Sequence, residues 1–258
     1  MTQFAAVLTL IGGPTVLIEI GGLRLLTDPT FDGPGTYQLP HVTLEKRAGP
    51  ALAAAEVGRI DAVLLSHDQH ADNLDTAGRD CLGAVPAVLT TRAGAERLGG
   101  ATRGLAPWQT VEIAGADGGH LQVTATPARH GPAGIEPLSG DVIGFLIGLD
   151  QPGDAIYVTG DTVWYDGVAE IARRYRPRLV ILFAGSAKTR GALRLTMDAN
   201  DAIETAHAFP YAQIVAIHND SWAHFTETRE DLERAFAALG LADRLRRLKA
   251  GVGVTMEL

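Results

Sequence analysis

The sequence predicts an α/β protein in which helices cover the outer faces of β-sheets, an α/β sandwich. Short apolar runs bounded by Gly, Pro and Asp dominate the first half of the chain. Strand and helix patterns alternate in the second half. No linker and no strong internal repeat separates the two halves, so we expect one domain over residues 1–258.

The first half is expected to consist mostly of strands. Apolar and alternating runs predict strands, and short Ala-rich or helically spaced stretches predict helices between them. Residues 30–50 hold several Gly and Pro residues and are expected to form a long loop, of the kind that serves as a lid. The expected strands are 6–10, 15–20, 23–27, 63–65, 85–89, 111–113, 121–127, 142–149 and 155–159, and the expected helices are 51–57, 75–79 and 93–98.

The second half is expected to alternate between helix and strand. Helical spacing of apolar residues predicts three helices, and Asp198 stands where its side chain can cap the second of them. The expected helices are 168–175, 198–208 and 226–239, and the expected strands are 178–183, 213–217 and 251–256.

Composition limits the classes of partner. The chain has 258 residues, 46% of them hydrophobic, with a formal net charge of −8 and a pI near 5.4. Nucleic acid is therefore not an expected partner, because phosphate binding needs a basic face. No signal peptide and no run of roughly 18–20 apolar residues is evident, so we expect a cytoplasmic protein without a membrane span. Cys81 is the only cysteine and is expected to be a small packed side chain.

Metal-binding residue types follow four of the expected strands. The run 63–65 ends at a polar cluster that contains His67, Gln69, His70 and Asp72, although the whole chain has only eight histidines. His130, Asp161 and His218 follow three later strands. Imidazole and carboxylate are the ligands that zinc and similar divalent ions take. Because strand ends in a sandwich can meet at one edge, these residues predict a metal site.

These motifs resemble those of the metallo-β-lactamase fold superfamily. The similarity extends over nearly the whole chain and is greatest to the branch of ascorbate-phosphate lactonase-like and N-acyl phosphatidylethanolamine phospholipase D-like hydrolases. It rests on residues 15–22, 26–29, 65–68, 127–130, 158–162 and 217–218. The resemblance implies an αββα sandwich of two mixed β-sheets and a hydrolase that holds one or two divalent ions, zinc first, with manganese or iron as alternatives.

The resemblance also implies the ligand sets. The first ion would take His67, either His70 or Gln69, His130 and Asp161. The second would take Asp72, the residue at position 73, Asp161 and His218. The chain departs from the family motif His-x-His-x-Asp-His, since it carries one extra residue near Gln69 and has Asn73 in place of the last His. Amide oxygens are weaker ligands than imidazole, so the second site is expected to be weakened.

The expected chemistry is hydrolysis by a metal-activated water. Asp72 would orient the water or accept its proton, and His224 would line the pocket and act on the substrate. The expected substrate is a small ester, lactone or phosphodiester. The alternative is a metal-poor relative that binds or converts a small molecule without metal-dependent hydrolysis. A homo-oligomer is compatible with both.

Several other polar residues could have a functional role or could simply be solvated or packed side chains. Lys188 and Arg190 lie in a loop where a phosphate or carboxylate could dock, although solvated loop charges are the favoured explanation for both. Arg129 would position a carboxylate beside His130, and His41 would belong to the lid. The remaining histidines, expected at the surface or in packing, are His120 and His207.

Overall fold

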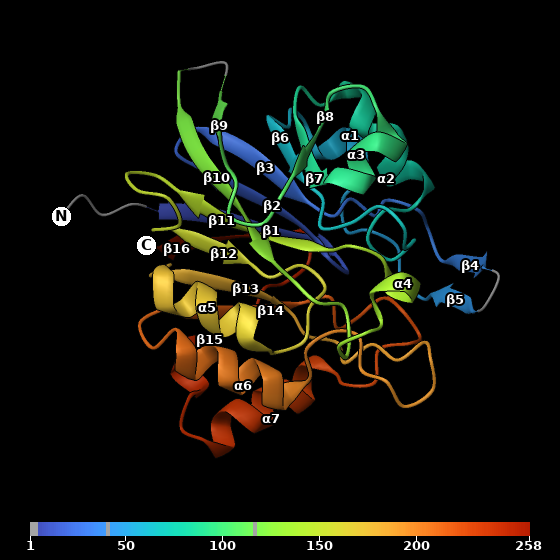
Figure 1. The fold of residues 1–258 in the computed structure, drawn as a ribbon, viewed down its shortest axis with the longest axis vertical. Helices are drawn as coiled ribbons and strands as arrows, with labels where there is room; N and C mark the ends of the chain where they lie inside the picture. Colours follow the sequence, from blue (N-terminus) through green and yellow to red (C-terminus); the bar gives the residue numbers. More distant parts are fainter. Residues whose placement is uncertain (1–4, 40–41, 116–117) are drawn as a thin grey trace.

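A computed structural model describes residues 5–39, 42–115 and 118–258. Within these residues two seven-stranded mixed sheets form the centre of the molecule (Figure 1). The first sheet has the order β16 (Gly253–Glu257), β1 (Ala5–Gly12), β2 (Thr15–Ile20), β3 (Leu23–Thr27), β6 (Ala62–Leu64), β7 (Val88–Thr91) and β8 (Thr102–Leu105). Its strands are antiparallel from β16 to β3 and parallel from β3 to β8.

The second sheet has the same kind of mixed pairing. Its order is β15 (Leu245–Arg246), β14 (Gln213–Ile217), β13 (Leu179–Phe183), β12 (Ile156–Val158), β11 (Ile143–Gly148), β10 (His120–Pro127) and β9 (Thr110–Ala114). The pairs from β9 to β12 are antiparallel, and those from β12 to β15 are parallel. The expected sandwich of two mixed sheets is confirmed.

Helices lie on the outer face of each sheet (Figure 1). Helices α1 (Ala54–Val57), α2 (Thr76–Cys81) and α3 (Arg92–Leu98) accompany the first sheet, with a short 3-10 turn at Leu82–Ala84. Helices α5 (Asp166–Arg174), α6 (Ala199–Ala208) and α7 (Arg229–Ala238) cover the second, followed by a 3-10 turn at Ala242–Arg244. The cap expected at Asp198 is confirmed, because its carboxylate accepts from the Asp201 amide.

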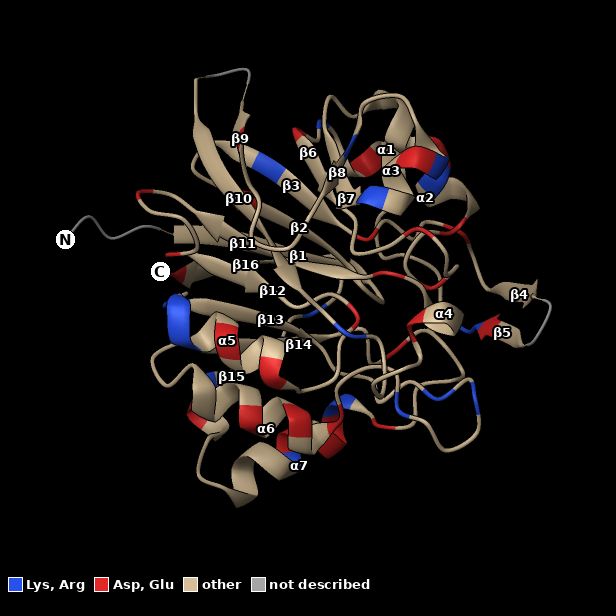
Figure 2. Cartoon of the chain, viewed as in Figure 1, with Lys and Arg blue, Asp and Glu red and all other residues tan. Residues whose placement is uncertain are grey.

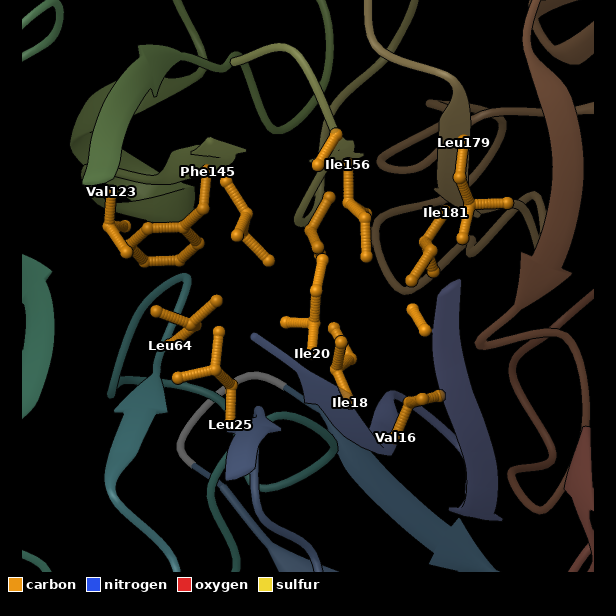
Figure 3. Packing of buried hydrophobic residues seen from close by; sticks show 14 of the residues in the cluster. Val16, Ile18, Ile20, Leu25, Leu64, Val123, Phe145, Ile156, Leu179 and Ile181 are labelled. Carbon is orange, nitrogen blue, oxygen red and sulfur yellow. The ribbon is translucent and has the colours of Figure 1, made fainter. Parts of the chain in front are cut away.

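Side-chain alternation divides the apolar residues into layers. Val16, Ile18 and Ile20 point from the first sheet to the centre of the sandwich, where they face residues such as Phe145 and Ile181 of the second sheet (Figure 3). On β13 the intervening residues, Val180 and Leu182, pack instead under the outer helices. Strands buried on both faces read as continuous apolar runs in the sequence, which is why β13 was predictable.

The prediction of a structureless loop over residues 30–50 was wrong in part. Strands β4 (Gly35–Gln38) and β5 (Thr43–Lys46) pair as a separate two-stranded hairpin. Their residues are mostly exposed, so no apolar alternation reports them in the sequence. The short helix α4 (Glu136–Ser139) and β15 were also missed. His41, expected in a lid, lies outside the described residues.

One buried ion pair holds the hairpin against the rest of the chain. Lys46 Nζ lies 2.8 Å from Asp75 Oδ2, and both side chains are buried. The Asp75 carboxylate also accepts from the amides of Phe31, Asp32 and Gly78, the last as the cap of α2. Asp75 thereby joins the hairpin, the segment after β3 and the polar segment after β6. Within the described residues no helix is long and apolar enough to cross a membrane.

Lys46→Met is expected to lower the free energy of unfolding by about 3–5 kcal/mol, because it leaves the buried Asp75 carboxylate without its cation. Urea denaturation measures this change. Lys249→Met is the matched control, since Lys249 is exposed, and it should leave the midpoint nearly unchanged. Equal midpoints for the two variants would mean that the ion pair does not stabilise the fold.

Candidate metal centre

The ends of four strands bring the sequence-predicted metal residues together. His67, His70 and Asp72 lie in the segment after β6. His130 follows β10, Asp161 follows β12 and His218 follows β14. They form two overlapping groups, and within each group the nearest donor atoms all lie within 4.8 Å of one another. The groups are His67, His70, His130 and Asp161, and Asp72, Asp161 and His218.

The first group is a cluster of imidazole nitrogens. His70 Nδ1 lies 2.9 Å from His67 Nε2 and 3.2 Å from His130 Nε2. His130 Nε2 lies 3.7 Å from Asp161 Oδ2. His67 and His130 are buried, and His70 is half-buried.

Hydrogen bonds on the far side of two rings fix where the protons sit. Ser66 Oγ donates to Asp28 Oδ2 at 2.7 Å, so it accepts from His67 Nδ1 at 2.9 Å. His130 Nδ1 donates to the Leu195 carbonyl at 2.8 Å. Both Nε2 atoms therefore face the cluster as lone pairs. Converging lone pairs of this kind suit a cation, and outward N–H bonds orient metal-binding histidines.

The second group combines two carboxylates with one imidazole. His218 Nε2 lies 3.3 Å from Asp161 Oδ1 and 3.6 Å from Asp72 Oδ2. Asp161 Oδ1 and both ring nitrogens of His218 are buried without a hydrogen-bond partner. Since buried polar atoms are nearly always satisfied, these orphaned atoms also fit a bound cation. The two oxygens of Asp161 point one to each group, which is the arrangement of a bridging ligand.

The backbone at His218 is held in an unusual conformation. Its φ is +56°, in the left-handed region that residues other than glycine seldom occupy. The His218 amide donates to the Gly13 carbonyl at 3.0 Å, which ties the end of β14 to the turn between β1 and β2. Local strain of this kind is commonest at functional sites.

The surroundings of the cluster set its protonation. Burial, reinforced by the neighbouring imidazoles, lowers the pKa of His67 well below its usual value and that of His70 to about 4. Burial alone would raise the pKa values of Asp72 and Asp161, but the adjacent imidazoles outweigh it and lower both. Neutral imidazole and ionised carboxylate are the forms that bind metal.

The two departures from the family motif lie outside both donor groups. Gln69 is exposed, and its amide packs over Gly140, where an added Cβ would lie 2.0 Å from Nε2. Of the two alternatives for the second imidazole position, the structure therefore places His70, not Gln69, beside His67. Asn73 is buried and donates from Nδ2 to Asp28 Oδ2 at 3.3 Å.

His224 joins the centre from the segment after β14. Its Nε2 lies 2.9 Å from Asp72 Oδ2, and it belongs to neither donor group. The prediction that it lines the pocket is borne out by its place in the cavity wall described below. Its role in catalysis stays a prediction.

A cavity of about 240 Å³ opens over the donor residues. His70, Asp72, His130 and His224 form its polar side. Another part of the lining is aliphatic and comes from the hairpin, from α4 and from the segment before α6: Leu39, Val42, Leu44, Leu138, Ala187 and Leu195. Arg190, Gln69, Ser139 and Thr189 complete the lining.

The remaining candidates lie away from this cavity. His120 is exposed, with Nδ1 3.5 Å from Glu112, and His207 is exposed near the end of α6. Burial raises the pKa of Cys81 to about 11, so its thiol stays protonated. The expectation for Arg129 was wrong, because among the described residues it stacks over the Tyr165 ring at 4.5 Å and has no carboxylate partner.

Sequence reasoning missed the residues that support the site. Asp28 and Ser66 were noted only as part of motifs, and the Leu195 carbonyl has no side-chain signal at all. The apolar hairpin residues Leu39, Val42 and Leu44 were hidden in the segment expected to be a loop. The break after residue 27, where an acidic residue precedes a proline, was the one available clue.

Comparisons with known proteins agree with this geometry. The family model described as a beta-lactamase superfamily domain matches residues 23–219. The UPF0173 protein YddR of Bacillus subtilis is 25% identical over 92% of this chain and 95% of its own length. A UPF0173 metal-dependent hydrolase of Herpetosiphon aurantiacus is 27% identical over 84% of this chain and 88% of its own length.

A solved structure shares the fold from end to end. The isothiocyanate hydrolase from Delia radicum gut bacteria superposes with a TM-score of 0.81 and is 25% identical, covering 98% of this chain and 100% of that protein. The predicted fold and the predicted superfamily are thereby confirmed. The narrower branch within it stays a prediction.

His70→Ala is expected to reduce metal binding, whereas Gln69→Ala should not, because only His70 faces His67 and His130. Loss of a residue that merely orients a ligand costs about 10–100-fold in metal affinity, so loss of a ligand should cost at least as much. Elemental analysis and competition with a chromogenic chelator measure both variants. The reverse order of affinities would assign the position to Gln69.

Proposed function

The chain belongs to the beta-lactamase superfamily and is a metal-dependent hydrolase, and on that premise we propose that it hydrolyses a small ester or lactone with an apolar body. The observation that carries this proposal is the cavity. Part of its lining consists of metal-binding residue types, and another part is aliphatic. A substrate that fits both sides places a polar reacting group at the donors and an apolar group against the wall.

We propose zinc as the metal, since three imidazoles and a carboxylate match its preferred ligands. His67, His70, His130 and Asp161 would hold the first ion, and Asp72, Asp161 and His218 a second, weaker one. Bound there, zinc would lower the pKa of water and polarise the substrate oxygen. The metal-poor alternative is disfavoured, because neither Gln69 nor Asn73 replaces a donor residue of the first group.

The chain's own residues would position and deprotonate the water. Asp72 Oδ2 lies near His218 Nε2 and accepts from His224 Nε2, so the carboxylate is held in one orientation. A carboxylate fixed this way can accept the proton of an attacking water at its oxygen. The aliphatic wall would exclude bulk water and hold the apolar part of the substrate against the reacting group.

A carbon centre fits this site better than a phosphodiester. Among the described residues that line the cavity, Arg190 is the one Lys or Arg, and the lining also contains the buried carboxylate Asp72. Phosphoryl sites usually surround the charged group with several cations. An isothiocyanate is a second candidate with a carbon centre, because the similar gut-bacterial enzyme is named for that substrate.

The test compares four probes: phenyl hexanoate, δ-decanolactone, bis(4-nitrophenyl) phosphate and benzyl isothiocyanate. We expect zinc-dependent hydrolysis of the ester or lactone, lost after chelation and restored by zinc. Asp72→Asn should lower kcat by about 10²–10⁴-fold, the usual contribution of a general base.

Asp80→Asn, at an exposed carboxylate, is the control and should keep wild-type rates. Faster turnover of the phosphodiester than of every carbon-centred probe would contradict the proposed substrate class. Full activity in the chelated protein would contradict the proposed mechanism.

A further inference from the structure

We propose that Arg190 binds a carboxylate at the end of the substrate remote from the scissile bond, which makes the substrate an apolar-bodied ester or lactone acid. The inference rests on the proposed function and narrows it. Its observations are the position of Arg190 in the cavity lining, the absence of an acidic partner for it among the described residues, and the apolar side chains that line the same cavity.

Arg190 stands on a loop whose two ends are fastened. The loop over residues 187–194 runs between β13 and α6, and the Leu195 amide donates to the Ala187 carbonyl at 2.9 Å where it returns. The Lys188 amide donates to the His224 carbonyl at 3.2 Å, which ties the loop to a residue beside Asp72. Arg190 lines the same cavity as His70 and Asp72. The guanidinium is thus part of the substrate pocket.

The guanidinium of Arg190 keeps most of its donors free. A guanidinium has five N–H donors. In the described residues it makes one hydrogen bond, from Nη2 to the Leu138 carbonyl at 3.2 Å, and no ion pair with Asp or Glu. Arg194, on the same loop, differs because it pairs with Asp198 and Asp201. Figure 2 draws the basic residues of this loop in blue.

An unpaired arginine is conspicuous in a chain of net charge −8. Acidic residues outnumber basic ones, 30 to 22, yet none of those that the structure describes forms an ion pair with this side chain. Its one tether, the Leu138 carbonyl, holds it beside the aliphatic wall. A half-buried guanidinium next to apolar side chains attracts an anion more strongly than one in open water.

The charge count favours a single carboxylate over a phosphate. Guanidinium matches a carboxylate through two parallel hydrogen bonds. Lys188, the nearest other cation along the chain, is exposed and is not part of the cavity lining. A dianionic phosphate would therefore meet one cation only, while a monoanion is neutralised. Leu138 and Leu195 line the same cavity as Arg190 and His70, which suits an aliphatic spacer.

The experiment uses two esters that differ only at the remote end. Phenyl hydrogen adipate carries a terminal carboxylate, and phenyl hexanoate lacks it. In the zinc-loaded protein we expect a KM about tenfold lower for the acid, since a hydrogen bond to a charged group contributes about 1.5–3 kcal/mol. Arg190→Gln should remove that advantage, so that the KM values of the two esters in this variant lie within about twofold of each other.

Two further variants separate recognition from general charge. Lys188→Gln changes the neighbouring exposed cation and should leave both KM values unchanged. Arg190→Lys keeps the charge without the planar fork, so its KM for the acid should lie between those of wild type and Arg190→Gln. Zinc content and circular dichroism of each variant establish that the site remains folded.

Binding is measured separately from hydrolysis with the unreactive anilides adipanilic acid and hexananilide. Calorimetry on the zinc-loaded protein should show tighter binding of the acid that depends on Arg190. If the esters are not hydrolysed but this difference persists, the proposed function fails and the anion site stands. Equal affinity of wild type and Arg190→Gln for adipanilic acid would overturn the inference, and so would tighter binding of an analogue with a terminal phosphonate.

Discussion

The donor cluster depends on the hydrogen bonds that the buried Asp28 carboxylate accepts. Asp28 follows β3, which pairs in parallel with β6, so its side chain meets Ser66 just beyond the end of β6. Its two oxygens accept from the amide and the hydroxyl of Ser66, and that hydroxyl in turn holds His67 Nδ1. The same carboxylate accepts from Asn73. One side chain thereby orients the first imidazole and fixes the path of the segment that carries the others.

This arrangement places three carboxyl groups in the buried interior, where the loss of solvation disfavours their ionised forms. Asp28, Asp72 and Asp161 are all buried, and burial raises the pKa of Asp28 to about 7. Asp72 and Asp161 have imidazoles as their near neighbours, with no Lys or Arg paired to either among the described residues. Uncompensated buried charge costs several kcal/mol per ion, and a bound cation would offset that cost. The site is therefore expected to be less stable without a bound cation than with one, which is the expected property of a metal-binding centre.

The two sheets position the donor residues, whereas separate segments at the edge of the sandwich form the aliphatic lining of the cavity. The two sheets present donors from β6, β10, β12 and β14 at one edge, and these positions follow from strand pairing. The aliphatic part of the cavity lining comes from separate segments: the β4–β5 hairpin, α4 and the loop over 187–194 with the residue after it. The hairpin is held by the buried pair of Lys46 and Asp75 and by backbone hydrogen bonds to residues 221–223, not by either sheet. Substrate selection can therefore change with these segments while the donors stay in place.

The sequence by itself determined the layers of the fold and the residues of the donor cluster. Apolar runs report strands such as β13 because both faces are buried, and His130, Asp161 and His218 were visible because each follows such a run. Tertiary structure decided the rest. Spacing could not choose between Gln69 and His70, because the choice depends on which side chain turns toward His130, a residue on another strand. The exposed hairpin carries no apolar alternation, and Arg190 became a pocket residue only when its loop packed beside Leu138. The local pattern of apolar residues in the sequence indicates which segments are buried. The site, however, is formed by contacts between segments that are distant in the chain.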